Sequence, residues 1–164
     1  MLLAQINSEK VSLAEGHSNS QIDFQAFVEL AKEVQASHEM RQISVDTFVA
    51  YSEDDSTIIL DSRSEMAYKL CHFEGAKHLS FSDFNASNLE SIIESKDTRI
   101  LIFCNNNFAE DCYPFTSTLP SLALSIPTYL SLYAHGYKNI YMLKDEVSVE
   151  DEPLEFLWDG LLLR

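Results

Sequence analysis

Residues 99–112, RILIFCNNNFAEDC, contain the most hydrophobic strand expected in the chain and the polar loop that follows it. The apolar run at 100–103 is typical of a strand that is buried on both faces of a sheet. Cys104 stands where this strand is expected to end, and Cys112 follows two acidic residues. Two interpretations of Cys104 are open: a nucleophile at the edge of a sheet, or a small buried residue that precedes a loop.

Outward from this strand, segments typical of strands alternate with segments typical of helices. We expect strands at 42–44, 57–60, 76–79, 99–103 and 139–142. We expect helices at 22–42, 45–55, 62–70, 86–95 and 126–135. This alternation predicts an α/β domain with a mainly parallel sheet.

Small polar residues indicate where the helices begin and end. The expected N-caps and capping boxes are Asp23, Ser44, Ser62 with Glu65, and Ser87 with Glu90. Ser125 and Pro127 are expected to open the last helix, and Gly136 stands where a left-handed residue follows a helix.

Length and charge limit the classes of function. The 164 residues suit one domain, and the net charge of −15 opposes binding to nucleic acid or to anionic membrane surfaces. The sequence contains no run of about 20 apolar residues that would span a membrane. Its three cysteines do not form a disulfide framework, and no CxxC spacing indicates a zinc site, so we expect no metal and no cofactor.

The two ends of the chain are expected to extend the central domain. Residues 1–20 have the composition of a flexible arm or of the remainder of a trimmed export signal, and 21–41 form a helical extension. Residues 146–164 combine an acidic stretch with an apolar end that is expected to pack on the domain at 42–145. We expect a soluble protein, and the sequence is compatible with either the cytoplasm or the periplasm as its compartment.

Three ordered motifs resemble the rhodanese (sulfurtransferase) domain family. The segment IILDSRSEMAYKLCHFEGAKHLSF resembles its strand, Asp-x-Arg and short helix, and RILIFC resembles the strand that ends in its active cysteine. LYAHGYKNIYML is similar to its closing helix, turn and last strand, and the CNNNF loop resembles a bacterial branch of single-domain members. The resemblance implies a central, mainly parallel five-stranded sheet with helices on both faces.

The resemblance also implies roles for individual residues. Cys104 would accept a sulfane sulfur and become a persulfide, and the loop formed by Asn105, Asn106, Asn107 and Phe108 would bind the substrate. Loop N–H groups that turn inward would stabilise the thiolate, which is the reactive form of cysteine. Asp61, Arg63 and His72 would support the site: the first two as an ion pair and the histidine as a brace for its loop. The expected partners are a small sulfur donor, a thiol acceptor or another protein.

Two departures from the family pattern bear on activity. Glu110 and Asp111 lie in the loop, and no Lys or Arg occurs between residues 100 and 137, so a thiosulfate-like dianion would meet acids instead of cations. The segment between Cys104 and Gly136 is longer than the family pattern, and it is expected to cover the site or to fill it. A cysteine phosphatase is excluded because Cys-x5-Arg is required, and the sixth residue after Cys104 is Glu110.

Two alternatives to a sulfurtransferase follow from these departures. The first is a catalytically inactive rhodanese-like domain that binds a partner or regulates it. The second is a thiol redox sensor in which Cys112 acts as the resolving thiol for Cys104.

Overall fold

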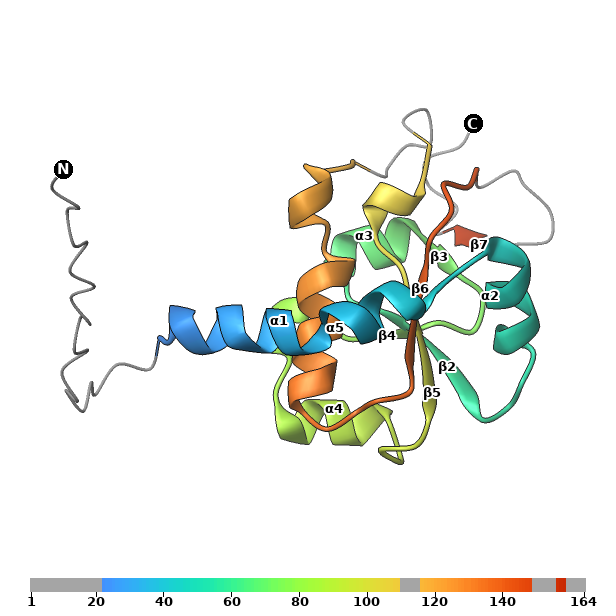
Figure 1. Cartoon of the computed structure of the whole chain (residues 1–164). Helices are drawn as coiled ribbons and strands as arrows, with labels where there is room; N and C mark the ends of the chain where they lie inside the picture. The colour runs from blue at the N-terminus through green and yellow to red at the C-terminus, as the bar shows by residue number, and fades with distance from the viewer. Residues whose placement is uncertain (1–21, 110–115, 149–155, 159–164) are drawn as a thin grey trace, which may run out of the picture.

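The computed structural model describes residues 22–109, 116–148 and 156–158. Five parallel strands form the central sheet in the order β1-β6-β5-β2-β4 (Figure 1). The strands are β1 (Gln42–Ile43), β2 (Thr57–Asp61), β4 (Lys77–His78), β5 (Arg99–Ile102) and β6 (Ile140–Leu143). The expected α/β fold with a five-stranded sheet is confirmed, and all of the pairings in this sheet are parallel.

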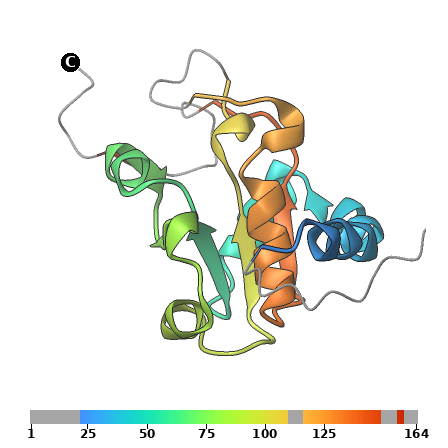
Figure 2. The same cartoon turned by 90° about the vertical axis from the view of Figure 1, so that its left-hand side faces the viewer.

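Helices cover both faces of the sheet. Helices α1 (Phe24–Met40), α4 (Ala86–Ile92) and α5 (Ser125–Ala134) pack on one face, whereas α2 (Val45–Ser52) and α3 (Glu65–Leu70) pack on the other. Figure 2 shows α1 beside α5 on the same side of the sheet. Alternate residues of the central strand serve the two cores, because Ile100 and Ile102 face α5 while Leu101 and Phe103 face α2.

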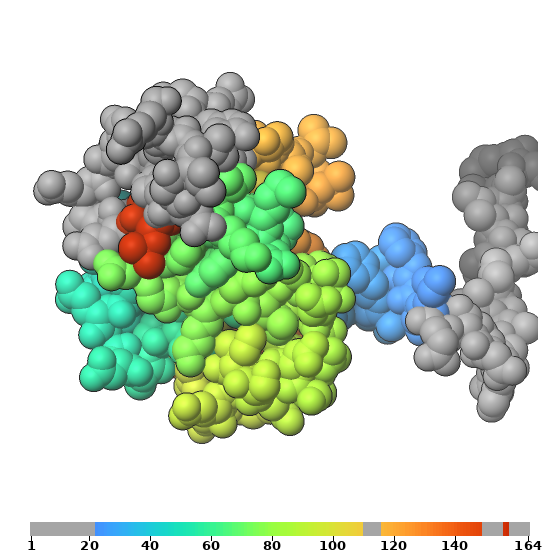
Figure 3. Space-filling model, turned by 180° about the vertical axis from the view of Figure 1, so that it is seen from behind, coloured from blue at the N-terminus to red at the C-terminus, as the bar shows by residue number. Residues whose placement is uncertain are grey.

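A second, two-stranded sheet was not expected from the sequence. Strand β3 (Cys71–Phe73) pairs antiparallel with β7 (Phe156–Trp158), which places the end of the described chain against the domain. The Phe156 ring stacks on the Phe73 ring with 4.4 Å between centroids. Figure 3 shows β7 at the molecular surface beside the segment that carries β3.

Two of the four expected helix caps are correct and two are wrong, and the expected start of a helix at Ser125 is correct. The side chains of Asp23 and Ser44 cap α1 and α2 as expected. Helix α3 is capped by Ser64 instead of Ser62, and α4 is capped by the Asn85 side chain instead of Ser87. Ser62 is unavailable as a cap because its hydroxyl is buried against α5.

Short 3₁₀ turns and one glycine shape the connections. The turns are η1 (Phe81–Asp83), η2 (Asn105–Asn107) and η3 (Pro120–Leu122). Gly136 follows α5 with φ of +90°, as expected of the left-handed residue after a helix. None of the helices within the described residues has the length and apolar character needed to cross a membrane.

Candidate active-site cysteine

Cys104 lies at the carboxyl edge of the sheet, directly after β5. The residue is 2% exposed, and its thiol contacts the hydroxyl of Ser125 with 3.6 Å between Sγ and Oγ. Ser125 is the first residue of α5. The N-terminus of a helix carries partial positive charge, and this end of α5 meets the Cys104 sulfur through Ser125.

A buried hydrogen bond anchors the first turn of α5 to the sheet. The hydroxyls of Ser62, which follows β2, and Thr128, on α5, lie 2.8 Å apart, and both residues are at most 1% exposed. Because Thr128 is one helical turn beyond Ser125, this bond fixes the position of Ser125 over the cysteine.

The loop after Cys104 is held by its own backbone and by one buried amide. The backbone N–H groups of Asn107 and Phe108 donate to the carbonyls of Cys104 and Asn105. The Asn107 side chain accepts from the Cys104 N–H at 3.0 Å and donates to the carbonyl of Leu143 at 2.9 Å. The Asn107 side chain therefore joins the loop to the end of β6.

The Phe108 side chain lies in the hydrophobic core, and its expected role in substrate binding stays a prediction. Phe108 is 3% exposed and packs in the core under α2, where its ring lies 5.9 Å from Phe103 and 5.7 Å from Phe156. The backbone N–H of the next residue, Ala109, donates to the carbonyl of Val147. In this 3₁₀ turn the backbone N–H groups at 107–109 donate to backbone carbonyls, and the Asn107 N–H also faces the Cys104 side chain in a capping box.

Asn105 and Asn106 tie the following segment across the loop. The Asn106 amide donates to the Thr118 carbonyl at 2.7 Å and accepts from the Thr118 backbone N–H at 3.1 Å. Asn105 donates to the Thr116 carbonyl at 3.3 Å and accepts from Arg63 at 3.4 Å. These side chains therefore hold residues 116–118 beside Cys104.

Asp61 and Arg63 form a buried ion pair beneath this loop. Asp61 accepts from the Arg63 backbone N–H at 3.0 Å and from two guanidinium nitrogens, the closer at 2.6 Å. Both side chains are at most 2% exposed, and Arg63 also donates to the Cys71 carbonyl. The pair joins the end of β2 to the start of β3, beside Asn105.

His72 belongs to a stack of aromatic rings at the end of α3. Its ring lies 3.8 Å from the Tyr68 ring, and its Nδ1 pairs with the Tyr68 carbonyl at 2.7 Å. His78 stacks on Tyr68 as well, at 4.6 Å, and its Nε2 pairs with the Arg63 carbonyl. These contacts brace α3 and the segment that carries Arg63.

The family model of the rhodanese-like domain matches residues 44–147. The chain belongs to the rhodanese-like domain family. The match includes every strand of the central sheet except β1, and it includes both Cys104 and Ser125.

Solved structures with a similar fold are distant in sequence, and no curated protein matches the chain. The BH2092 protein of Bacillus halodurans is 15% identical with a TM-score of 0.49, over 73% of this chain and 77% of that one. The rhodanese-like domain of the Alr3790 protein of Anabaena sp. is 17% identical with a TM-score of 0.47, over 63% and 67%. Protein hp1203 of Helicobacter pylori is 21% identical with a TM-score of 0.46, over 74% and 93%.

Several candidate residues of this rhodanese-like domain lie outside the described chain. Cys112, the proposed resolving thiol, and the acidic residues Glu110 and Asp111 all fall in 110–115. Among the described residues, no group of three His, Cys, Asp or Glu side chains is placed to hold a metal ion.

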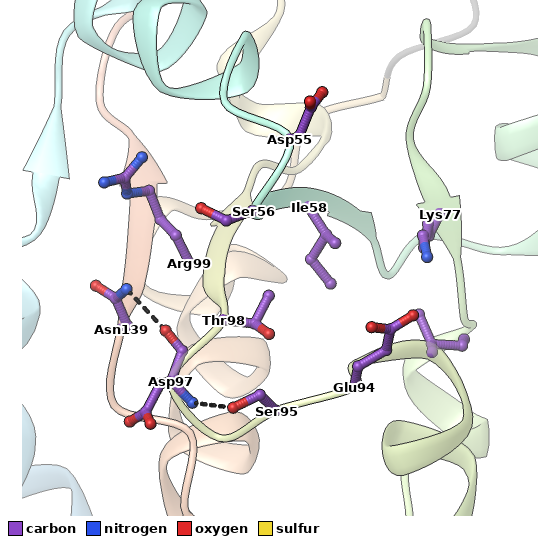
Figure 4. Close-up of a pocket in the computed structure, with 11 residues that line it drawn as sticks. Asp55, Ser56, Ile58, Lys77, Glu94, Ser95, Asp97, Thr98, Arg99 and Asn139 are labelled. Atoms are coloured by element: carbon purple, nitrogen blue, oxygen red, sulfur yellow. Dashed lines mark hydrogen bonds between the residues drawn. The ribbon is translucent and has the colours of Figure 1, made fainter.

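A polar cavity of about 420 Å³ lies at the opposite edge of the sheet from Cys104. It is lined by residues at the amino ends of β2 and β5, including Ser56 and Thr98, and by Lys77 of β4. Figure 4 shows the bond from Asn139 to the Asp97 carbonyl beside it. The cavity is therefore separate from the cysteine loop.

Sequence reasoning missed two residues beside the cysteine. Ser125 was expected only to open a helix, and no role was predicted for Thr118 within the long segment between Cys104 and Gly136. Ser125 and Thr118 are far from Cys104 in sequence, and the fold brings them beside the loop. No short sequence motif predicts this contact.

Proposed function

We propose that this rhodanese-like domain is a sulfurtransferase that carries a sulfane sulfur as a persulfide on Cys104. The observation that carries the proposal is the position of Cys104 at the carboxyl edge of β5, with its sulfur 3.6 Å from a hydroxyl at the N-terminus of α5. Ligands of parallel α/β sheets bind at this edge. A helix N-terminus and a hydroxyl donor both favour the thiolate that must attack.

The proposed reaction has two displacements. The Cys104 thiolate attacks the outer sulfur of a donor R–S–SH, the S–S bond of the donor breaks, and R–S⁻ leaves with the bonding electrons. Cys104 is then a persulfide. An acceptor thiolate attacks the outer sulfur in turn, receives it, and leaves the Cys104 thiolate for the next cycle.

The charges near Cys104 favour a thiol persulfide over thiosulfate as the donor. Arg63, which contacts the loop through Asn105, is neutralised by Asp61. The sequence offers no Lys or Arg between residues 100 and 137, and the chain carries a net charge of −15. A dianion lacks the paired cationic contacts that normally bind it, whereas the transferable sulfur of an alkyl persulfide does not need them.

Intact mass spectrometry tests the proposal. The reduced full chain is incubated with the persulfide of 2-mercaptoethanol, whose organic group is uncharged, freed of donor and weighed, and a gain of about 32 Da, one sulfur atom, is expected. The gain should disappear in Cys104→Ser and persist in Cys71→Ser, whose cysteine is fully buried in β3. An unmodified mass, or a gain that persists in Cys104→Ser, contradicts the proposal.

A second candidate function is a catalytically inactive binding module. It is favoured by the burial of Cys104 and by the internal partners of Asn105, Asn106 and Asn107. In this case the wild-type chain gains no sulfur from any persulfide donor. A variant that releases residues 116–118 from the loop would then also fail to accept sulfur on Cys104.

A further inference from the structure

The polar cavity at the amino ends of β2 and β5 carries a positive and a negative side chain that do not pair with each other. Lys77 belongs to β4, and Glu94 lies just after the end of α4. Within the described residues, neither side chain forms an ion pair or a hydrogen bond. Figure 4 shows the Glu94 carboxylate directed toward β4, the strand that carries Lys77. Both charges are therefore available to a ligand.

The second cation that lines the cavity, Arg99, already has protein partners. Its guanidinium donates to the Asp54 carboxylate at 3.1 Å and to the Thr57 hydroxyl at 3.2 Å. It also lies 4.3 Å from the centre of the Tyr51 ring. Lys77 is therefore the lining cation that is available to bind an anionic group.

Aliphatic side chains form another part of the cavity wall. Ile58 and Ile92 line the cavity and are partly buried against the core beneath α4 and α5. The volume of about 420 Å³ lies within the range of roughly 300–1,000 Å³ that is common for small-molecule sites. The cavity thus combines an aliphatic surface with two opposite, unpaired charges.

We propose that this cavity binds a free aliphatic amino acid. The ligand carboxylate would contact Lys77, its ammonium group would contact Glu94, and its aliphatic side chain would pack on Ile58 and Ile92. The cavity lies at the edge of the sheet opposite to Cys104, so the proposal does not depend on sulfur transfer.

The charges of the cavity favour a zwitterion over an ion of a single sign. A simple anion would be repelled by Glu94 and by the net charge of −15. A simple cation would be repelled by Lys77 and would leave that ammonium group without a partner. A ligand with both charges pairs with both side chains, so electrostatic complementarity selects it.

Nuclear magnetic resonance titration of the full chain with L-leucine tests the proposal. Saturable shifts are expected at the backbone amides of Ser56 and Thr98, which line the cavity, with a Kd on the order of 1 mM. Two analogues each lack one charge: 3-methylbutylamine has no carboxylate, and 4-methylpentanoate has no ammonium group. Each should bind about two- to fivefold more weakly, because it loses one partly exposed ionic contact.

Two variants assign each charge of the ligand to its side chain. Lys77→Gln should weaken the binding of L-leucine by about two- to fivefold without weakening that of 3-methylbutylamine. Glu94→Gln should weaken the binding of L-leucine without weakening that of 4-methylpentanoate. Lys32→Gln and Glu29→Gln remove the same charges from exposed positions on α1, and they should leave the affinity unchanged.

Three results would overturn the proposal. The first is the absence of saturable shifts at Ser56 and Thr98 with L-leucine up to about 50 mM, well above the expected Kd. The second is an analogue that binds as tightly as L-leucine does. The third is an unchanged affinity for L-leucine in both Lys77→Gln and Glu94→Gln. The dispersion of each variant's spectrum verifies that it is folded, which is expected because both side chains are exposed.

Discussion

Cys104 and Ser125 are 21 positions apart in sequence, yet their side chains meet with 3.6 Å between sulfur and oxygen. The contact joins the end of the central strand to the start of α5. The hydrogen bond between Ser62 and Thr128 holds the first turn of α5 in place. The Ser125 hydroxyl, which is in the same turn, is therefore held beside Cys104 although residues 105–124 separate the two in sequence. The thiol donates to the Ser125 hydroxyl, and the same hydroxyl can donate to the sulfur once Cys104 is ionised.

Replacing Ser125 with Ala should slow the reaction of Cys104 with an alkylating reagent at neutral pH. A hydrogen bond to a charged group contributes about 1.5–3 kcal/mol, which corresponds to a loss of roughly 10- to 100-fold in thiolate reactivity. Ser125→Thr should retain most of the rate because it keeps a hydroxyl, and Ser131→Ala, elsewhere on α5, should not change it. Rates are measured by peptide mass at Cys104. Equal rates for Ser125→Ala and the wild type would exclude this role.

Replacing Asn106 with Ala should expose Cys104. The Asn106 side chain makes three hydrogen bonds with Thr118, at 2.7, 3.1 and 3.2 Å. Each contributes about 1 kcal/mol net, so their loss should raise the open population roughly tenfold or more. Labelling of Cys104 by a bulky maleimide should accelerate accordingly, whereas Asn88→Ala, which removes an exposed amide on α4, leaves the rate unchanged. An unchanged rate in Asn106→Ala would mean that residues 116–118 do not restrict access.

The sequence was sufficient to predict the two longest apolar strands of the central sheet because these strands are encoded locally. The run at 99–103 and the β-branched run at 57–60 are long enough to be recognised as buried strands, and both lie at the expected positions. The β3–β7 sheet was not predictable in this way. Its strands have three residues each and come from distant parts of the chain. The local pattern of apolar residues therefore does not predict that the two strands pair.

The candidate site was predictable only in part. Asp61, Arg63 and Cys104 follow strand ends, so their position at one edge of the sheet follows from the parallel topology. The parallel topology does not determine the direction in which the side chains of the loop after Cys104 point. Asn107 points to the end of β6 because a buried carbonyl there needs a donor, and that partner is distant in sequence.

Breaking the buried ion pair should destabilise the domain strongly. Asp61→Asn leaves the Arg63 guanidinium buried without its counterion, which costs about 3–5 kcal/mol. The midpoint of urea unfolding should fall accordingly. Glu65→Gln, which removes an exposed i,i+4 ion pair with Lys69, should leave the midpoint almost unchanged. Similar midpoints for Asp61→Asn and Glu65→Gln would show that the buried pair contributes little.

Acidification should destabilise the wild-type chain more than a His38→Gln variant. Burial lowers the pKa of His38 from its ordinary value of 6.5, and the nearby Glu39 carboxylate only partly opposes this effect. The unfolded chain therefore binds a proton at a higher pH than the folded chain does, so the stability associated with His38 is complete above pH 6.5 and declines as the pH falls through that value toward the folded-state pKa. Thermal unfolding at low protein concentration, between pH 7.5 and about 5, measures the difference. The decline in midpoint should be shallower in His38→Gln than in the wild type. An equally steep decline in His38→Gln would show that other groups account for the acid sensitivity.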